Sequence, residues 1–151
     1  MIFRTARIDD IREMQRIRHA VKENRLSDPG LVTDQDCLEF ITNRGRGWVA
    51  ENGTSLAGFA IIDCKEKNIW ALFVEPAFEH QGIGRKLQKL MLDWYFSEHE
   101  EKVWLGTAPH TRAAGFYRKS GWRETGMSAN GEIRFEMSGL SWLKTSNKKN
   151  F

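Results

Sequence analysis

Hydrophobic residues recur along this chain at two spacings, one typical of helices and one typical of strands. Near the N-terminus, apolar side chains follow each other every three or four residues, at Ile8, Ile11, Met14, Ile17 and Val21. This spacing predicts a helix over about residues 10–23, with Asp10 and Glu13 as its capping box. Thr33 is expected to cap a second helix, which ends before Gly45.

Alternating or continuously apolar runs predict the strands, and turn residues separate them. The expected strands are residues 2–7, 48–51, 56–63, 68–74, 103–106, 122–127 and 133–138. Asn52-Gly53 and Asn130-Gly131 are typical of hairpin turns. Residues 68–74 are apolar on both faces, so we expect this strand to be central and buried. Two further helices are predicted over about residues 83–94 and 111–119.

The order of these elements predicts the fold class. It is β-α-α-β-β-β-α-β-α-β-β, without an internal repeat or a linker. This order indicates an α/β (α+β) fold with a mixed, mostly antiparallel central sheet flanked by helices. We expect one domain at residues 1–140. Residues 141–151 are basic and lack periodicity, and we expect them to form a flexible tail.

Composition and charge exclude several classes of protein. The 151 residues are 40% hydrophobic and 28% charged, as in ordinary folded domains. The chain has neither an apolar run long enough to cross a membrane nor a signal peptide, so we expect a cytoplasmic protein without a membrane partner. The net charge of +3 is too mild to indicate a nucleic-acid partner. Cys37 and Cys64 lack metal-ligand spacing, and no metal is expected.

Residues 72–87 carry the clearest chemical signal. Gly82 and Gly84 stand between a predicted strand and a helix that begins with Arg85 and Lys86. Glycine lets a backbone approach an anion, and the first turn of a helix offers unpaired N–H groups, so the pattern favours phosphate binding. A plain tight turn is the alternative. A dinucleotide site is disfavoured, because a leucine stands where its third glycine would be.

Two motifs carry a family likeness. The first is Leu72-x-Val74-x-Pro76 followed by Gln81-Gly82-Ile83-Gly84, and the second runs from Arg112 to Trp122, with Ala, Phe-Tyr and Lys-x-Gly-aromatic in order. One predicted strand separates them. Over about residues 2–138 the chain resembles the GCN5-related N-acetyltransferases, the GNAT superfamily.

The resemblance implies that the strand ending near Val74 splays from the strand beginning near Val103, and that acetyl-CoA lies in the gap as the acyl donor. The contacts that it implies for the cofactor are Phe73, Val74, Gln81, Gly82, Ile83, Gly84, Arg85, Lys86, His110, Ala113 and Phe116. Two positions depart from the family pattern. Glu79 stands where Arg or Gln is usual, and His110 where Asn is common, which leaves the cofactor affinity open.

The resemblance also implies acetyl transfer to a primary amine by direct attack in a ternary complex. Tyr117 would protonate the leaving thiolate, with a core tyrosine as the alternative. A backbone N–H near Val74 would hold the thioester carbonyl. The identity of the general base stays open. Glu75 follows the central strand, but it is expected to face a turn. The other candidates are Glu51, Asp63, Glu132, Glu136, His110 or a chain of waters.

The acceptor pocket is expected at the first interhelical loop, the central strand and the last hairpin. Its candidates are Arg25, Asp28, Trp70, Glu132 and Arg134. Asp28 or Glu132 suits a cationic amine, Arg25 or Arg134 suits a carboxylate, and Trp70 could instead be core, because it shares the strand parity of residues 72 and 74.

The expected partner is a small-molecule amine rather than a protein. Six Trp and nine Phe leave apolar surface for a homodimer. The alternative function is a non-catalytic acyl-CoA-binding module.

Overall fold

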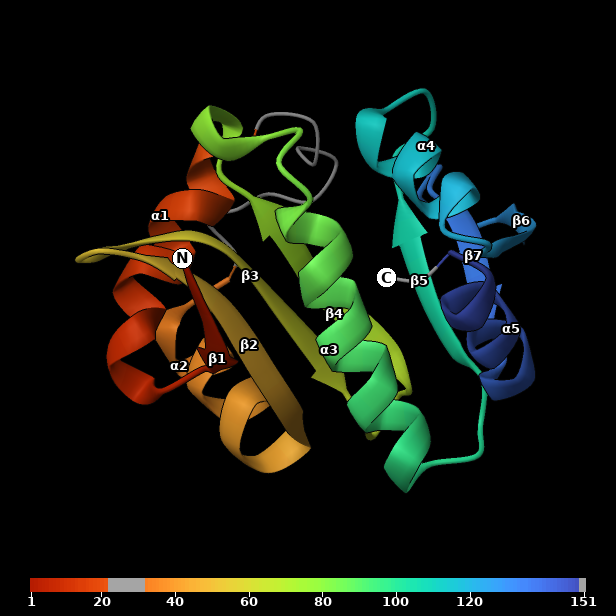
Figure 1. Ribbon diagram of the computed structural model, residues 1–151, viewed down its shortest axis with the longest axis horizontal. Coiled ribbons are helices and arrows are strands. Elements are labelled where there is room, and N and C mark those ends of the chain that lie inside the picture. Colours follow the sequence, from red (N-terminus) through yellow and green to blue (C-terminus); the bar gives the residue numbers. More distant parts are fainter. Residues whose placement is uncertain (22–31, 150–151) are drawn as a thin grey trace.

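The computed structural model describes residues 1–21 and 32–149 (Figure 1). Within them, seven strands form one sheet in the order β1-β2-β3-β4-β5-β7-β6. The strands are β1 (Ile2–Thr5), β2 (Gly45–Asn52), β3 (Ser55–Asp63), β4 (Asn68–Val74), β5 (Val103–Thr107), β6 (Arg123–Met127) and β7 (Ile133–Met137). Neighbours pair antiparallel except β4 and β5, which are parallel. The predicted mixed, mostly antiparallel sheet is confirmed.

Helices cover both faces of this sheet. They are α1 (Ile11–Ala20), α2 (Asp34–Glu39), α3 (Ile83–Glu98), α4 (Arg112–Lys119) and α5 (Gly139–Lys149). Three short turns accompany them, namely η1 (Ile8–Asp10), the π-helical η3 (Phe40–Arg44) and η4 (Pro76–Phe78). Figure 1 shows α1 and α2 against one face and α3 across the other. Thr33 caps α2 as predicted, since its hydroxyl accepts from the Asp36 N–H at 3.1 Å. None of the helices in the described residues is both long and apolar enough to cross a bilayer.

Each face of the sheet has its own apolar cluster. The cluster under α1 and α2 includes Ile11, Met14, Ile17, Cys37, Val49, Phe59, Ile61, Ala71 and Phe73. The cluster under α3, α4 and α5 includes Ala60, Ile62, Leu87, Met91, Tyr95, Leu105, Tyr117, Phe135 and Trp142. β3 contributes alternate residues to both clusters and is the strand buried along nearly its whole length. In β4, by contrast, every second residue is half-buried, because β4 borders an opening in the sheet.

That opening arises where β4 and β5 diverge. In the described chain these two strands pair at one position, Asn68 opposite Trp104. The side-chain amide of Asn68 donates to the Trp104 carbonyl at 3.2 Å, and the main-chain N–H of Trp104 donates to the Lys67 carbonyl at 3.0 Å. Beyond this point the strands separate toward their C-terminal ends (Figure 1). The predicted splay is therefore confirmed.

A β-bulge in β4 changes the expected direction of Trp70. The pairing with β3 skips Trp70, which becomes an extra residue between Ile69 and Ala71. Trp70 and Ala71 therefore both pack on the α1 side, whereas Leu72 and Val74 pack on the α3 side. The prediction that Trp70 shares the face of Leu72 and Val74 is wrong, because the bulge shifts the alternation by one residue.

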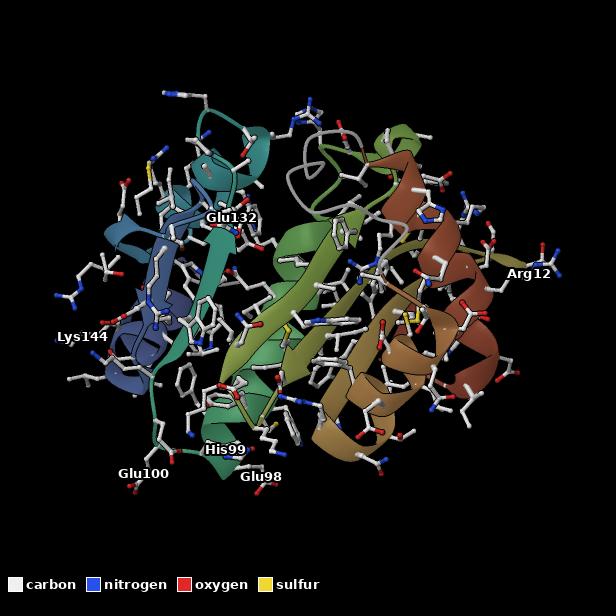
Figure 2. All side chains as sticks on the ribbon, turned by 180° about the vertical axis from the view of Figure 1, so that it is seen from behind. Arg12, Glu98, His99, Glu100, Glu132 and Lys144 are labelled. Carbon is white, nitrogen blue, oxygen red and sulfur yellow. The ribbon has the colours of Figure 1, made fainter. Side chains whose placement is uncertain are left out.

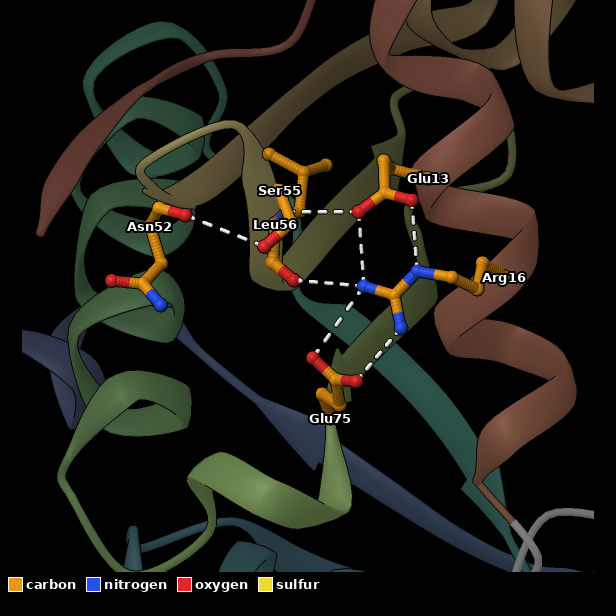
Figure 3. A network of polar contacts seen from close by, with 6 residues as sticks. All are labelled: Glu13, Arg16, Asn52, Ser55, Leu56 and Glu75. Carbon is orange, nitrogen blue, oxygen red and sulfur yellow. Dashed lines mark hydrogen bonds and ion pairs between the residues drawn. The ribbon is translucent and has the colours of Figure 1, made fainter.

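The start of α1 also differs from its prediction. Asp10 makes no side-chain cap for α1. Its carboxylate instead accepts from the Arg7 N–H at 2.7 Å and from two nitrogens of Arg4 at 2.8 Å each. Glu13 is directed to partners outside the cap (Figure 3). The predicted capping box is wrong because both carboxylates bind arginines, and α1 ends at Ala20 rather than near residue 23.

The C-terminal segment is helical where an irregular tail was predicted. α5 spans Gly139–Lys149, and the Trp142 side chain is 3% exposed. The Trp142 indole N–H donates to the Asp93 carboxylate of α3 at 2.8 Å. This long-range contact supplies the packing that the local sequence does not reveal.

Asp10→Asn should lower the free energy of unfolding at pH 7 by about 1–3 kcal/mol, because Arg4 loses its ionised partner. Burial alone would raise the pKa of Asp10, but the hydrogen bonds from Arg4 and Arg7 outweigh it and the pKa lies below the usual 3.8. The stabilisation is therefore present above about pH 4 and lost as the pH falls through the folded pKa. Urea unfolding at several pH values measures both effects.

Asp9→Asn is the matched control, since Asp9 is exposed beside it. We expect the control to unfold like the wild type. If the free energy of unfolding of Asp10→Asn falls with decreasing pH as it does in the wild type, the Asp10 carboxylate is not responsible for the loss of stability in acid.

Candidate active site

A cavity of about 650 Å³ lies at the open end of β4. It is lined by Val21, Leu72, Phe73, Val74, Phe78, Glu79, His80, Gly82, Ile83, Gly84, Arg85, Arg112, Ala113, Gly115, Phe116, Tyr117 and Lys119. The walls thus come from the end of β4, the η4–α3 connection, the start of α3 and the length of α4. The divergence of β4 from β5 opens this space.

The first turn of α3 supplies main-chain donors to the cavity. Gly82 precedes the helix with φ +79° and ψ 9°, a left-handed conformation that favours glycine. The N–H groups at the very start of a helix have no earlier helical carbonyl to bind, and Ile83 and Gly84 stand at these positions in α3. The Lys86 N–H already donates to the Gly82 carbonyl at 3.1 Å. The Lys86 amide thus takes part in the helix itself, and the contact of Lys86 with the cofactor stays a prediction.

Gly84 keeps a passage open between β4 and α4. A Cβ at this position would lie 3.5 Å from Val74 Cγ2 and 3.7 Å from Phe116 Cε1. These are ordinary contact distances, so a methyl group fits but a larger side chain would enter the space between the two walls. Glycine at this position therefore keeps the cavity open and is not required for the packing of the helix.

Glu79, which departs from the family pattern, lies in the cavity wall. Its carboxylate forms an ion pair with Arg112 at the start of α4. This contact joins the η4–α3 connection to α4, on the other side of the cavity. The negative charge of Glu79 is therefore matched by a neighbouring cation within the site.

The edge of β4 that faces β5 offers unpaired main-chain groups. Since the described strands pair only at Asn68, the residues from Leu72 to Val74 have no strand partner on this side. An extended ligand can bind such an edge as an added strand. Phe73 and Val74 both lie in the cavity wall, as the resemblance implies for residues that contact the pantetheine arm.

Tyr117 forms the apolar end of the cavity on α4. The side chain is 6% exposed, and its ring packs edge-to-face against Phe116 at 5.2 Å and Trp122 at 5.6 Å. Trp122 is itself held by its indole N–H, which donates to Gln88 Oε1 at 2.7 Å. Burial raises the pKa of Tyr117 above its usual value of 10. The hydroxyl is thus protonated at neutral pH and held in one place.

The structure brings most of the predicted cofactor residues together. Those that line the cavity are Phe73, Val74, Gly82, Ile83, Gly84, Arg85, Ala113 and Phe116, with Tyr117. Gln81 and His110 are exposed and do not line it, and His110 has a left-handed φ of 61°. The Lys86 ammonium lies 4.6 Å from the centre of the Phe3 ring on β1, away from the cavity wall.

The predicted acceptor residues do not gather at the cavity. Trp70 stacks on Phe40 with the ring centres 3.9 Å apart. Arg134 pairs with Glu136 at 3.3 Å and lies over the Trp104 ring at 4.3 Å. Glu132 accepts from the Asn130 amide at 3.1 Å, and Figure 2 shows it near the end of β5. The other two candidates, Arg25 and Asp28, lie outside the described residues.

The carboxylates considered as a general base are already engaged. The ion pairs are Glu51 with Arg4 at 3.2 Å, Asp63 with Arg44 at 2.7 Å, Glu75 with Arg16 at 2.7 Å, and Glu136 with Lys102 at 3.4 Å. None of these residues lines the cavity. Among the described residues, no group of three or more His, Cys, Asp or Glu side chains is placed to hold a metal ion.

A network around Arg16 fixes the turn after β4, and the sequence pattern did not predict it. Arg16 binds Glu13 at 2.8 Å, Glu75 at 2.7 Å and the Leu56 carbonyl at 3.2 Å (Figure 3). The three-residue spacing of Glu13 and Arg16 could have indicated the first contact. The contact with Glu75 joins residues 59 apart in the chain and has no local signal. The network ties α1 to the strand end that borders the cavity.

The splayed sheet, the glycine turn and the tyrosine-bearing α4 define an acyltransferase fold with a cleft between its two halves. The model of the acetyltransferase (GNAT) family matches residues 9–122, and the chain belongs to this family. It is thus an acetyltransferase that depends on acetyl-CoA.

Solved structures with the same fold are distant in sequence. A PaiA N-acetyltransferase from Thermoplasma acidophilum, in complex with coenzyme A, is 14% identical, with a TM-score of 0.75 over 91% of this chain and 98% of that chain. The ribosomal-protein-S18-alanine N-acetyltransferase from Escherichia coli is 18% identical, with a TM-score of 0.69 over 90% of both chains. An aminoglycoside 6'-acetyltransferase type Ii is 19% identical, with a TM-score of 0.75 over 91% of this chain and 97% of that chain. No curated protein matches the sequence.

Gly84→Val should weaken coenzyme A binding by about 1–3 kcal/mol, or roughly 5- to 150-fold in Kd, because its methyl groups would fill the passage between Val74 and Phe116. Gly84→Ala is the matched control and should bind more tightly than the valine variant. Isothermal titration gives both Kd values, and thermal unfolding checks that both variants are folded. Wild-type affinity in Gly84→Val would exclude this passage as the binding route.

Proposed function

We propose that this protein transfers an acetyl group from acetyl-CoA to a primary amine of a small molecule, by direct attack in a ternary complex. One observation carries the proposal most strongly. Tyr117, a buried tyrosine whose pKa is raised by burial, lines a cavity beside the open edge of β4. A general acid next to an extended binding edge is what thioester aminolysis needs.

The cavity suits coenzyme A in both charge and shape. The main-chain N–H groups of Ile83 and Gly84 at the start of α3 and the positive charge of Arg85 suit a pyrophosphate. The open edge at Phe73 and Val74 suits the amide groups of a pantetheine arm. Ala113 and Phe116 on α4 provide the opposite wall. Acetyl-CoA, when bound, supplies a thioester with a good leaving group.

The proposed roles of the residues follow the charge that develops during transfer. A backbone N–H near Val74 stabilises the oxygen of the thioester carbonyl. Tyr117 donates its proton to the sulfur as the thiolate leaves. A thiolate in the same apolar cavity is poorly solvated, so its proton affinity rises together with that of the tyrosine.

The amine is proposed to lose its proton to water rather than to a carboxylate. The carboxylates considered as a base are paired with arginine or lysine or bound to Asn130, and none lines the cavity. The remaining carboxylate in the wall, Glu79, is paired with Arg112. A substrate that binds as the neutral amine needs no base before the attack, and the proton that its nitrogen then loses passes to water.

The similar structures include an N-acetyltransferase for an alanine of a ribosomal protein and an acetyltransferase for an aminoglycoside. These acceptors belong to different classes of molecule, so the fold alone does not choose between them. The small-molecule acceptor, the homodimer and the cytoplasmic location stay predictions.

Tyr117→Phe should lower kcat by roughly 10²–10⁴, the usual contribution of a positioned general acid. Coenzyme A binding should be unchanged, because the ring and its packing stay. Thiol release from acetyl-CoA with a panel of amines measures turnover, and titration measures binding.

Tyr95→Phe is the matched control. Tyr95 is also buried, it does not line the cavity, and its hydroxyl has no hydrogen-bond partner in the described chain. We expect turnover close to that of the wild type. If both variants keep full activity, Tyr117 is not the acid; if the wild type binds coenzyme A without turnover of any amine, the non-catalytic acyl-CoA-binding module is favoured.

The pH dependence of kcat/KM should be set by the pKa of the substrate amine rather than by the pKa of a base in the enzyme. kcat/KM should rise tenfold per pH unit until the pKa of the amine is reached, because only the neutral amine attacks. It should not fall again below pH 10, because the raised pKa of Tyr117 keeps the acid protonated. Initial rates between pH 6 and 10 test this, and a plateau that starts at the same pH for amines of different pKa would indicate a base in the protein.

A further inference from the structure

Arg18 on α1 is a shielded cation that the proposed chemistry does not use. Its guanidinium carbon lies 4.9 Å from the centre of the Trp70 ring, 5.0 Å from that of Phe73 and 5.9 Å from that of Phe59. Within residues 1–21 and 32–149, its Nε and Nη2 atoms are shielded from solvent and have no hydrogen-bond acceptor. Burial lowers the pKa of Arg18, yet a guanidinium remains charged at neutral pH.

The Nε and Nη2 atoms of Arg18, which have no acceptor among the described residues, form the edge of the guanidinium that binds carboxylates elsewhere in this protein. Arg16 holds both oxygens of Glu13 with Nε at 2.8 Å and Nη2 at 2.9 Å. Arg44 holds both oxygens of Asp63 with Nε at 3.2 Å and Nη2 at 2.7 Å. The same two donors of Arg18 thus match one flat, two-oxygen anion.

Packing on aromatic rings does not by itself explain this arginine. Ring faces attract the cation but cannot accept in the plane of the guanidinium, where its N–H groups point. Two buried donors without acceptors in the described part of the chain are unfavourable for folding, and an apolar side chain would fill the same space without that cost. A charge kept in such a place is typical of a binding site.

The position of Arg18 connects it to the reaction site. Phe73, whose ring lies under the guanidinium, also lines the cavity, and so does Val21, which follows Arg18 by one helical turn. Arg18 packs with the cluster on the α1 face, whereas Tyr117 belongs to the cluster on the α3 face. Figure 1 shows α1 and α4 on either side of the open ends of β4 and β5. An acceptor held at Arg18 would therefore meet the thioester from the face opposite Tyr117.

We infer that Arg18 binds the carboxylate of the acceptor, and that the acceptor is a small molecule with both a primary amine and a carboxylate. The inference rests on the proposed function. It differs from the sequence-based candidates, because Arg134 is paired with Glu136 and Arg25 lies outside the described residues. Both donors are shielded and Arg18 itself does not line the cavity, so the proposed binding requires a local rearrangement that admits the carboxylate.

The test compares acceptors that differ in the carboxylate alone. L-Amino acids and their amides are assayed as pairs by thiol release from acetyl-CoA, and rates are expressed per concentration of neutral amine, because amides have less basic amines. The wild type should favour the acid in kcat/KM by about tenfold or more, the worth of a hydrogen-bonded ion pair. Arg18→Met should lose this preference while its rate with the amide stays within about threefold, and Arg18→Lys should retain part of it.

Arg46→Gln is the matched control. Arg46 also lies over an aromatic ring, Trp94 at 4.7 Å, but it is exposed and does not line the cavity. The control should keep the wild-type preference for the acid. Thermal unfolding and coenzyme A titration check that each variant is folded.

A second measurement does not depend on turnover. N-acetyl-L-amino acids and their amides, which resemble the products, are titrated into the protein saturated with coenzyme A. Tighter binding of the acids by the wild type but not by Arg18→Met supports the inference. Equal binding of acids and amides by the wild type, or a preference that survives in Arg18→Met, overturns it. Either result leaves the proposed transferase intact, whereas failure to bind coenzyme A would overturn the proposed function itself.

Discussion

The divergence of two parallel strands is the constraint on which the rest of this structure depends. β4 and β5 share one paired position, Asn68 opposite Trp104, and then separate. Without this separation, the end of β4 would be covered on both edges and the cavity would not exist. In the described chain, the same divergence leaves main-chain groups of β4 without a partner in β5. It lets Phe73 line the cavity while it packs in the cluster on the α1 face. It also brings α4 opposite the first turn of α3.

Arginines hold the elements around this opening in place. Arg16 ties α1 to the turn after β4, Arg4 fixes the start of α1, and Arg112 links α4 to the connection before α3. Each of these contacts joins segments that are separate in the fold and lie near its surface. The proposed reaction site therefore has an apolar interior surrounded by charged contacts, and Arg18 takes no part in these three ion pairs.

The sequence was sufficient for the fold class and for the glycine turn, because both depend on local patterns. Periodicity identified nearly every helix and strand, and Gly82 and Tyr117 lie at the cavity as the motifs implied. Long-range contacts explain what was missed. The bulge at Trp70 reverses the alternation, and Asp93 anchors a helix that local periodicity did not predict. Asp10 binds Arg4 and the Arg7 N–H instead of capping α1.

The residues proposed to bind the acceptor were the hardest to predict, because tertiary structure brings them together. Arg18 stands in an ordinary amphipathic helix, and nothing in the neighbouring sequence distinguishes it from other arginines. Its environment of three rings comes from β3 and β4, more than 40 residues later in the chain. Only the folded protein shows that two of its donors have no acceptor among the described residues.

The single bridge between β4 and β5 also has a mechanical consequence. The sheet consists of two hydrogen-bonded blocks, β1 to β4 and β5 to β6, and no ladder crosses most of the boundary between them in the described chain. The blocks can tilt about the Asn68–Trp104 contact while every ladder hydrogen bond inside each block stays formed. Opening and closing of the cleft is then resisted mainly by side-chain packing under α3. This motion costs less free energy than opening any other part of the sheet, where ladder hydrogen bonds would have to break.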